Sequence, residues 1–381
     1  MSDIDGQTQD RQIPDKAVFL PLAQFQQFLE LVQQRYKIIG PVVKDEAIQY
    51  QPINDIHALT RGIRVEQNPG QYSLEASDNN LFFAWSNGAQ ALKPLLFSPK
   101  ESLWQAQRDE QGRLGFVALT AKPTATAVIG VRACDLAALA LQDQHFLEKA
   151  QPDPQYQARR QALFLIGVDC THPANTCFCA ATHDGPALQT GFDIALSELA
   201  EGFLLRPGSR QGRALLAQLD LAPATATQQK TATQAIQRAA DMQQRCLPED
   251  NSHQQLYNQA EHPHWQAIAE RCLACGNCTM VCPTCFCYSA HTETALDGGN
   301  ATQVRQWDSC FSHGHSNLHG HPVRADIKSR YRQWLSHKLT GWLEQFGKSG
   351  CVGCGRCITW CPVGIDLTAE AQHLTQPGES V

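Results

Sequence analysis

The alternation of apolar and polar residues predicts an N-terminal region that mixes strands and helices. Residues 17–32 begin like a strand and continue with apolar side chains at helical spacing. Residues 36–84 contain short strand-like runs separated by turn residues, such as those at 68–70. We therefore expect an α+β chain, in which a mixed α/β domain comes first and an α-helical ferredoxin-like domain follows.

Two later segments are almost wholly apolar. Residues 127–131 and 162–168 are short enough for strands, and polar residues follow each of them. Continuous apolar runs of this length are typical of strands buried on both faces of a parallel sheet. The first run leads into a helical pattern in which Asp135 is a candidate cap.

A change in composition predicts how the chain divides. Residues 222–246 are rich in Ala, Gln and Thr and have few large apolar groups, which is typical of a linker or a solvated helix. We predict an α/β domain at 1–221, a linker or solvated helix at 222–261, and a cysteine-rich domain at 262–381.

The cysteine content is high, at 16 in 381 residues. The N-terminus is polar, without the apolar segment of a signal peptide, and no apolar run approaches the roughly 18 residues of a membrane span. We therefore expect a cytoplasmic protein whose clustered cysteines bind metal rather than form disulfides. With 31 basic and 37 acidic residues, the net charge of -6 argues against a general nucleic-acid binder.

Two cysteine runs have the same spacing. The first run, CLACGNCTMVCP at 272–283, and the second run, CVGCGRCITWCP at 351–362, both fit C-x2-C-x2-C-x3-C-P. Three closely spaced cysteines reach three iron corners of a [4Fe–4S] cubane, and the last cysteine of each run ligates the other cluster in two-cluster ferredoxins. We predict one cluster on Cys272, Cys275, Cys278 and Cys361, and a second on Cys351, Cys354, Cys357 and Cys282.

Structural zinc is the alternative interpretation of these runs. Zinc sites use two cysteine pairs, which does not explain a third cysteine and a following proline in both runs. The glycines at 276 and 355 permit close backbone approach to a cluster. Residues 283–350 separate the runs and contain the helical pattern WLSHKLTGWLEQFG, which favours an α-helical module over the compact β-containing ferredoxin.

A third group of cysteines follows the two apolar runs. Cys134 and Cys170 come shortly after the first and second run, and Cys177 and Cys179 return in the same loop. If the two strands are parallel neighbours, these sulfurs meet at one sheet edge. We predict a third [4Fe–4S] cluster there; buried packing thiols and a redox thiol pair are the alternatives.

The remaining cysteines and a histidine tract are less specific. Cys285, Cys287 and Cys310 are candidates for a further cluster with Asp308, for completing a neighbouring site, or for packing. Cys246 stands alone in a polar segment and is expected to be inert. The tract HGHSNLHGH resembles a metal-binding sequence, but we interpret it as a solvated loop beside a cluster. Its histidines are His313, His315, His319 and His321.

Several sequence runs together resemble a known family. They are GVRACDL (130–136), GVDCTHPANTCFC (167–179), GFDIALSEL (191–199), CGNCTMVCPTCFC (275–287), RQWDSC (305–310), SRYRQWLSHKL (329–339) and CVGCGRCITWCPVGID (351–366). The chain is similar in these runs to the β subunit of cytosolic NiFe sulfhydrogenases and the A subunit of anaerobic sulfite reductases. It departs from them at Ala133, where the family usually has proline, and in the histidine tract, where the family is glycine-rich.

This resemblance implies an electron-transfer subunit. Its partners would be a flavoprotein that binds NAD(P) and a catalytic subunit, either a NiFe hydrogenase or a sulfite reductase. No G-x-G-x-x-G follows a predicted strand, and no site for hydrogen, sulfite or nicotinamide is evident, so we expect no catalysis by this chain alone. The alternatives are a redox sensor and a sulfur-compound reductase that acts on its own.

Overall fold

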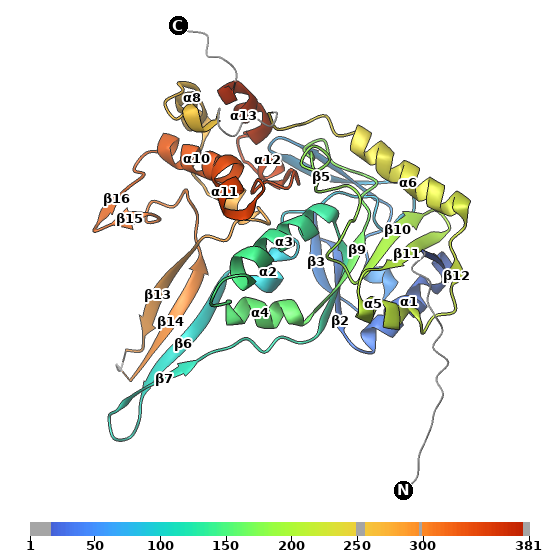
Figure 1. Cartoon of the computed structure of the whole chain (residues 1–381), viewed down its shortest axis with the longest axis horizontal. Coiled ribbons are helices and arrows are strands. Elements are labelled where there is room, and N and C mark those ends of the chain that lie inside the picture. The colour runs from blue at the N-terminus through green and yellow to red at the C-terminus, as the bar shows by residue number, and fades with distance from the viewer. Residues whose placement is uncertain (1–16, 249–255, 297–298, 376–381) are drawn as a thin grey trace.

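The N-terminal part of the molecule is built on a large mixed sheet (Figure 1). The computed structural model describes residues 17–248, 256–296 and 299–375. Within these residues, the sheet has eight strands in the order β12-β1-β11-β10-β9-β8-β2-β3. They are β1 (Val18–Pro21), β2 (Lys37–Lys44), β3 (Ala47–Ile53), β8 (Thr126–Val131), β9 (Leu163–Val168), β10 (Ile194–Leu199), β11 (Gly202–Pro207) and β12 (Ala222–Pro223).

The centre of this sheet is parallel and its margins are antiparallel. Strand β8 pairs in parallel with β9, with Val128 opposite Leu165, and the neighbouring pairs β2–β8 and β9–β10 are also parallel. This arrangement confirms the two predicted buried strands, which are apolar throughout because helices cover both faces of the sheet. The mixed α/β character expected of the N-terminal region is therefore confirmed.

Two sets of helices cover the sheet. Helices α1 (Phe25–Gln33) and α5 (Arg210–Leu216) share a core with Ile129 and Ile166. The opposite face packs against α2 (Lys93–Leu96), α3 (Ala133–Leu147) and α4 (Pro154–Gln161). Arg132 is the N-cap residue of α3, so the prediction that Asp135 caps this helix was wrong. Short 3-10 turns lie at Leu22–Gln24 and Ile56–Ala58.

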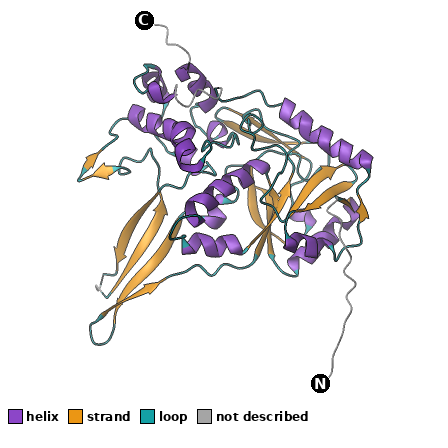
Figure 2. Ribbon diagram, viewed as in Figure 1, coloured by secondary structure: helices purple, strands orange, loops and turns teal. Residues whose placement is uncertain are grey.

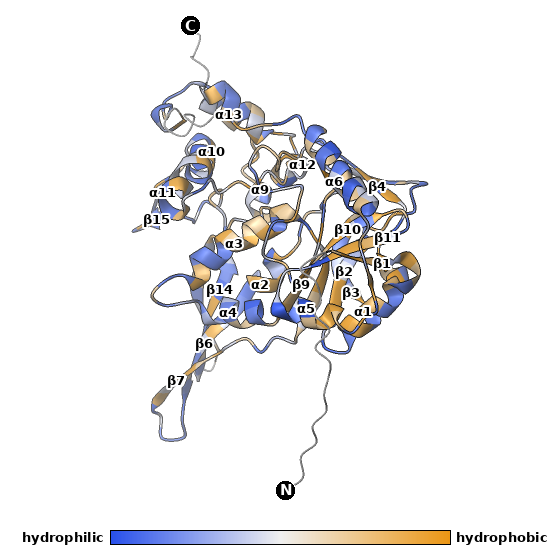
Figure 3. Cartoon of the chain, turned by 45° about the vertical axis from the view of Figure 1, so that its right-hand side comes forward, coloured by the Kyte–Doolittle hydropathy of each residue, from blue (hydrophilic) through white to orange (hydrophobic). Residues whose placement is uncertain are grey.

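The polar segment after the sheet is a solvated helix. Helix α6 (Ala226–Asp241) begins with a capping box in which Thr225 and Gln228 bond reciprocally. Figure 3 shows this helix mainly in hydrophilic colours, in contrast to the strands of the large sheet. The domain boundaries proposed around this segment stay a prediction.

The cysteine-rich C-terminal part is mainly helical. Its helices are α8 (His264–Arg271), α9 (Asn277–Met280), α10 (Ile327–Ser336), the π-helical turn η3 (His337–Gly341), α11 (Trp342–Phe346), α12 (Arg356–Thr359) and α13 (Leu367–Thr375). Trp265, Tyr331, Trp334 and Leu335 form its buried core with the cysteine loops. The expected ferredoxin-like C-terminal region is thus present, and among the described helices none is long and apolar enough to cross a bilayer.

A second sheet joins the two parts of the chain. Strands β13 (Tyr288–Thr294) and β14 (Asn300–Trp307) pair with β6 (Lys100–Arg108) and β7 (Leu114–Ala118), in the order β13-β14-β6-β7. Figure 2 shows this sheet projecting from the body of the molecule. The helical pattern between the cysteine runs favoured an α-helical module and did not predict this hairpin. Two further hairpins are β4 (Ile63–Asn68) with β5 (Gln71–Ala76) and β15 (Asn317–Leu318) with β16 (His321–Pro322).

Buried charges hold the projecting sheet to the body. The Arg305 Nε of β14 donates to Glu101 of β6 at 3.0 Å, and the second Glu101 oxygen lies 2.7 Å from Arg159 of α4. Separating these side chains would leave an uncompensated buried charge, which is costly. The contacts of Arg305 with Glu101, and of Glu101 with Arg159, therefore hold the hairpin after the first cysteine run in one orientation.

Candidate metal centres

The first group of sulfurs combines both cysteine runs. Sulfur group 1 consists of Cys272, Cys275, Cys278 and Cys361, which line one cavity together with Cys357. Three of the four come from the tight loop between α8 and the end of α9, where Gly276 takes a left-handed conformation at φ 74. The fourth comes from the second run, after α12. Cys361 therefore lies in space beside the three cysteines of the first run, although it belongs to the second run in the sequence.

Backbone amides point at the sulfurs of group 1. The Ala274 N–H donates to Cys272 Sγ at 3.4 Å, and the Ile365 N–H donates to Cys361 Sγ at 3.3 Å. Such bonds stabilise negatively charged sulfur and tune the potential of a bound cluster. The rest of the wall is apolar and includes Phe311, Tyr331 and Trp334. Four converging sulfurs with amide donors in an apolar cavity fit a [4Fe–4S] cluster.

Burial disfavours the thiolate form of the group 1 cysteines, as Cys278 shows. Burial raises the pKa of the Cys278 thiol well above its ordinary value, and the nearby sulfurs of Cys272 and Cys361 raise it further. An unligated thiol at this position would stay protonated at neutral pH. The positive charge of iron would supply the compensation that a thiolate needs here.

The second group of sulfurs has the reciprocal composition. Sulfur group 2 consists of Cys282 from the first run and Cys351, Cys354 and Cys357 from the second run. Burial raises the pKa of Cys357 well above its ordinary value, and the next contributions come from the sulfurs of the other three. Cys278 of group 1 also contributes to this shift, which places the two groups next to each other.

Two buried lysines surround Cys282. The Lys338 ammonium donates to Cys282 Sγ at 3.4 Å, to Thr284 Oγ1 at 2.9 Å and to the Gly350 carbonyl at 3.2 Å. Burial alone would lower the pKa of Lys338, but the sulfurs of Cys282 and Cys285 hold it well above its ordinary value. Group 2 therefore has a fixed positive charge against one of its sulfurs.

The second lysine contacts the same loop through its backbone. Lys93 of α2 donates to the carbonyls of Thr279 at 3.2 Å, Met280 at 3.3 Å and Cys282 at 3.2 Å. Burial lowers the pKa of Lys93. These bonds satisfy carbonyls at the end of α9 and fix the position from which Cys282 leaves the first run.

The third group of sulfurs lies at the edge of the large sheet. Sulfur group 3 consists of Cys134 in the first turn of α3, Cys170 after β9, and Cys177 and Cys179 in the loop that follows. Burial raises the pKa of Cys177 to about 12, with Cys170 as the next contributor. Burial also raises the pKa of Cys179, followed by the effects of Cys177 and Cys170.

Cys134 completes this group. Burial raises its pKa well above the ordinary value, with Asp135 and Cys179 as the next contributors. The Asn87 side-chain amide donates to Cys134 Sγ at 3.4 Å. Strands β8 and β9 are parallel neighbours, so their ends bring Cys134 and Cys170 to the same edge. This is the convergence that the sequence analysis expected of the strand ends.

The loop of group 3 packs directly on the second cysteine run. The Phe178 N–H donates to the Gly353 carbonyl at 2.8 Å. A Cβ added at Gly353 would lie 2.5 Å from the Cys179 nitrogen, and one at Gly355 would lie 2.5 Å from the Thr176 carbonyl oxygen. Glycine is therefore required at both positions, because the two loops approach backbone to backbone.

A buried ion pair ties groups 2 and 3 together. Arg356, between Cys354 and Cys357, lies 2.8 Å from Asp135, which follows Cys134. Both side chains are 1% exposed, so each charge depends on the other. Cys134 and Cys179 also share a buried cluster with Val352 and Cys354. Groups 1, 2 and 3 thus form a continuous series.

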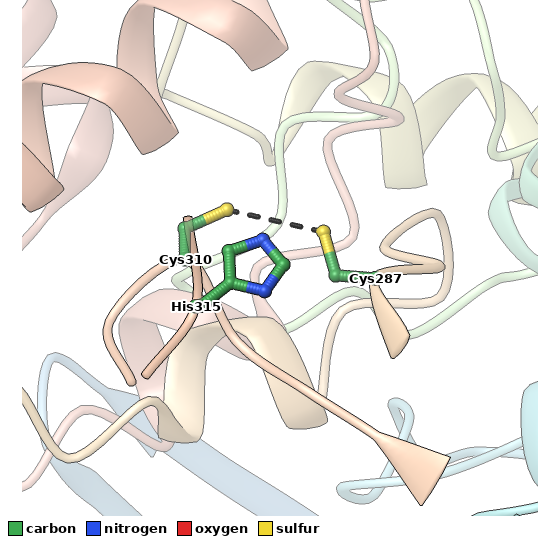
Figure 4. Close-up of side chains that lie close together, drawn as sticks. All are labelled: Cys287, Cys310 and His315. Atoms are coloured by element: carbon green, nitrogen blue, oxygen red, sulfur yellow. Dashed lines mark hydrogen bonds between the residues drawn. The ribbon is translucent and has the colours of Figure 1, made fainter. Parts of the chain in front are cut away.

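The three remaining candidate cysteines do not stay together. Cys285 lies against Cys282, and hydrogen bonding between them raises the pKa of Cys285 and lowers that of Cys282. Cys287 and Cys310 face each other instead, with their sulfurs 3.9 Å apart. His315 lies beside this pair, and all three ligand atoms are within 4.8 Å of one another (Figure 4). These three residues are the Cys2His group.

Hydrogen bonding within the Cys2His group shifts its pKa values in different directions, and the bond with Cys310, together with burial, raises the pKa of Cys287. Hydrogen bonding with Cys287 lowers the pKa of Cys310 to about 7. The Cys287 sulfur raises the pKa of His315 to about 9 against the effect of partial burial, and Asp308 contributes in the same direction. The sequence analysis assigned the whole histidine tract to a solvated loop. That interpretation fits the exposed His313, whereas His315 is half-buried beside the two sulfurs.

Cys246 lies apart from all these groups. It is exposed, and its nearest polar contact is the Gln372 side chain, with 3.6 Å between Nε2 and Sγ. This position agrees with the expectation that it is inert.

Comparison with known proteins agrees with this cysteine geometry. Residues 271–365, which contain groups 1 and 2, match the family model described as a 4Fe-4S dicluster domain. The chain is therefore an iron–sulfur protein with a dicluster domain, which implies two [4Fe–4S] clusters and a role in electron transfer. No solved structure matches it significantly.

The particular relationship covers nearly the whole chain. Over 349 residues it is 27% identical to the Sulfhydrogenase 2 subunit beta of Pyrococcus furiosus, and the alignment spans 90% of this chain and 93% of that protein. The protein is thus a homologue of a sulfhydrogenase beta subunit, as the resemblance in its sequence runs implied.

Proposed function

We propose that the two clusters of the dicluster domain are cross-ligated. One would bind the cysteines of group 1 and the other those of group 2, so that each run supplies its fourth cysteine to the other cluster. The common cavity of group 1, which includes Cys361, supports this assignment. The second cluster is supported by the position of Cys282, whose sulfur lies close enough to Cys357 of the second run to raise the pKa of that thiol.

Group 3 is proposed to bind a third [4Fe–4S] cluster. The support for this proposal is that four cysteine sulfurs lie near the ends of β8 and β9, close enough to raise one another's pKa. Packing thiols alone would not explain four cysteines in one place that come from helix α3 and from the loop after β9. The shared buried cluster with Cys354 puts this third cluster next to group 2.

The resulting function is an electron relay between two partner proteins. The observation that carries this proposal is the continuous series from group 3 through group 2 to group 1. Group 1 lies toward the surface, where Cys275 is exposed and Leu273 is 62% exposed. Group 3 lies in the α/β part. One partner would exchange electrons at each end: a flavoprotein that binds NAD(P), and a catalytic subunit such as a NiFe hydrogenase or sulfite reductase.

Lys338 is expected to raise the reduction potential of the group 2 cluster. Reduction adds negative charge, which an ammonium 3.4 Å from Cys282 Sγ stabilises. Lys338→Met should therefore lower that midpoint potential by roughly 60–120 mV, about 59 mV for each tenfold change in the equilibrium. Electron paramagnetic resonance during a redox titration measures this shift. Lys230→Met on exposed α6 is the control, and an unchanged potential in the Lys338 variant would refute the assignment.

The relay itself is tested by reduction with and without a partner. NADH or NADPH alone should not reduce the clusters, because no nucleotide-binding fingerprint was found in the sequence. If the chain is a relay, addition of its NAD(P)H-oxidising flavoprotein partner should bleach the broad violet absorbance of the clusters. Rapid bleaching without the flavoprotein would reveal a nucleotide or flavin site in this chain. Clusters that dithionite bleaches but the reduced flavoprotein does not would contradict the relay.

A further inference from the structure

The Cys2His group lies at the base of the hairpin that joins the two parts of the chain. Cys287 directly precedes β13, and Cys310 follows β14 by three positions. The strands pair Tyr288 with Trp307, and the Asp308 N–H donates to the Cys287 carbonyl at 3.0 Å. The two cysteines are therefore brought together by backbone pairing, independently of any cluster.

The distance between the two sulfurs, at which two thiols also form a hydrogen bond, matches that of two ligands on one metal ion. Two thiolates on a single tetrahedral zinc ion, with bonds of about 2.3 Å, lie about 3.8 Å apart. The distance between Cys287 Sγ and Cys310 Sγ is 3.9 Å. Thiolates on two corners of a cubane lie further apart, because each sulfur points away from the cluster along its own iron. A disulfide needs about 2.05 Å. The observed spacing fits one shared ion.

The histidine is oriented as metal-binding histidines are. His315 Nδ1 lies 2.9 Å from Asp308 Oδ2, and Asp308 Oδ1 accepts from the Ser309 N–H at 2.7 Å. With Nδ1 engaged, the ring nitrogen that faces the two sulfurs in Figure 4 is Nε2. A carboxylate behind a ligating imidazole fixes the ring and its tautomer, which is the common arrangement around protein-bound zinc.

We propose that Cys287, Cys310 and His315 bind one Zn²⁺ ion, with Asp308 as the positioning residue. Thiolate and imidazole together are ligands that zinc favours. The three ligand residues are half-buried, and among the described residues no fourth side chain joins them. Water would therefore occupy the fourth position, as in zinc sites with three protein ligands. The ion would link the cysteine-rich domain to the sheet it shares with the α/β part.

Metal analysis of the full chain, purified anaerobically without a histidine tag, tests this proposal. We expect about one zinc per chain in addition to the iron of the clusters. His315→Ala and Cys310→Ser should each reduce zinc to near zero without changing the iron content. Asp308→Asn should weaken zinc binding by about 10–100-fold. His313→Ala, in the same tract but exposed, is the matched control and should retain the ion.

The identity of the ligands is tested separately from protein stability. Zinc-edge X-ray absorption of the unmodified protein should show two sulfurs at about 2.3 Å and a nitrogen at about 2.0 Å. Absence of zinc, zinc that persists in His315→Ala, or iron in place of zinc would overturn the proposal. Loss of iron in step with zinc in Cys310→Ser would instead assign that cysteine to a cluster. A His315→Cys variant that regains zinc would show that loss of a ligand, rather than misfolding, explains the alanine result.

Discussion

Cys361→Ser is expected to remove the cluster held by the first cysteine run, although the two are far apart in sequence. The physical reason is that Cys361 lines the cavity of group 1 with Cys272, Cys275 and Cys278, which Cys357 of group 2 also borders. Iron should fall from about 12 to about 8 atoms per chain. Cys246→Ser is the control, because that cysteine is exposed and outside every sulfur group.

Matched variants identify which cluster is lost. Cys361→Ser and Cys272→Ser should leave the same remaining electron paramagnetic resonance signals after reduction. Cys282→Ser should resemble Cys351→Ser in the same way, because both cysteines belong to group 2. If Cys361→Ser instead matches Cys351→Ser, each run holds its own cluster and cross-ligation is wrong.

Cys134→Ser, as a separate variant, should remove the cluster of about four iron atoms from the α/β part and leave the dicluster domain loaded. This cysteine is the best single test of group 3, because it lies in α3 and not in the loop that packs on Gly353. The iron content should fall to about 8 atoms per chain, and electrons should no longer pass between the two partners. Cys246→Ser again serves as the control. Unchanged iron in the Cys134 variant would show that group 3 is a set of packing thiols.

Local patterns in the sequence predicted much of the fold. The apolar runs at 127–131 and 162–168 became β8 and β9, since strands covered on both faces have few polar residues. The cysteine spacing predicted groups 1 and 2 for a similar reason. A loop that must direct three sulfurs to one centre leaves a short and regular interval in the sequence.

Contacts between distant segments could not be predicted in this way. Strand β13 is polar and exposed, and β14 is mostly polar and partly buried, so no apolar pattern marks them. The pairing of β14 with β6 depends on residues about 200 positions away. The buried ion pair of Asp135 with Arg356 is equally non-local. From the sequence, Asp135 was interpreted as a helix cap, because no residue close to it in the chain indicates its pairing with Arg356.

His315 illustrates the same limit at the metal sites. Four histidines in one polar tract have similar sequence surroundings, and only tertiary structure separates them. The strand pairing that brings Cys287 to Cys310, together with the turn that returns to Asp308, selects His315. Cys285, which precedes Cys287 by two residues, is turned to Cys282 instead. In a regular strand Cys285 and Cys287 would lie on the same face, but the chain before β13 is not regular, and its bend separates these two cysteines.

The central claim is that three four-cysteine groups hold three [4Fe–4S] clusters in series. Its most direct test is the iron and acid-labile sulfide content of the unmodified chain after anaerobic purification. Three clusters predict about 12 iron and about 12 sulfide per chain. About 8 of each would contradict a cluster in the α/β part.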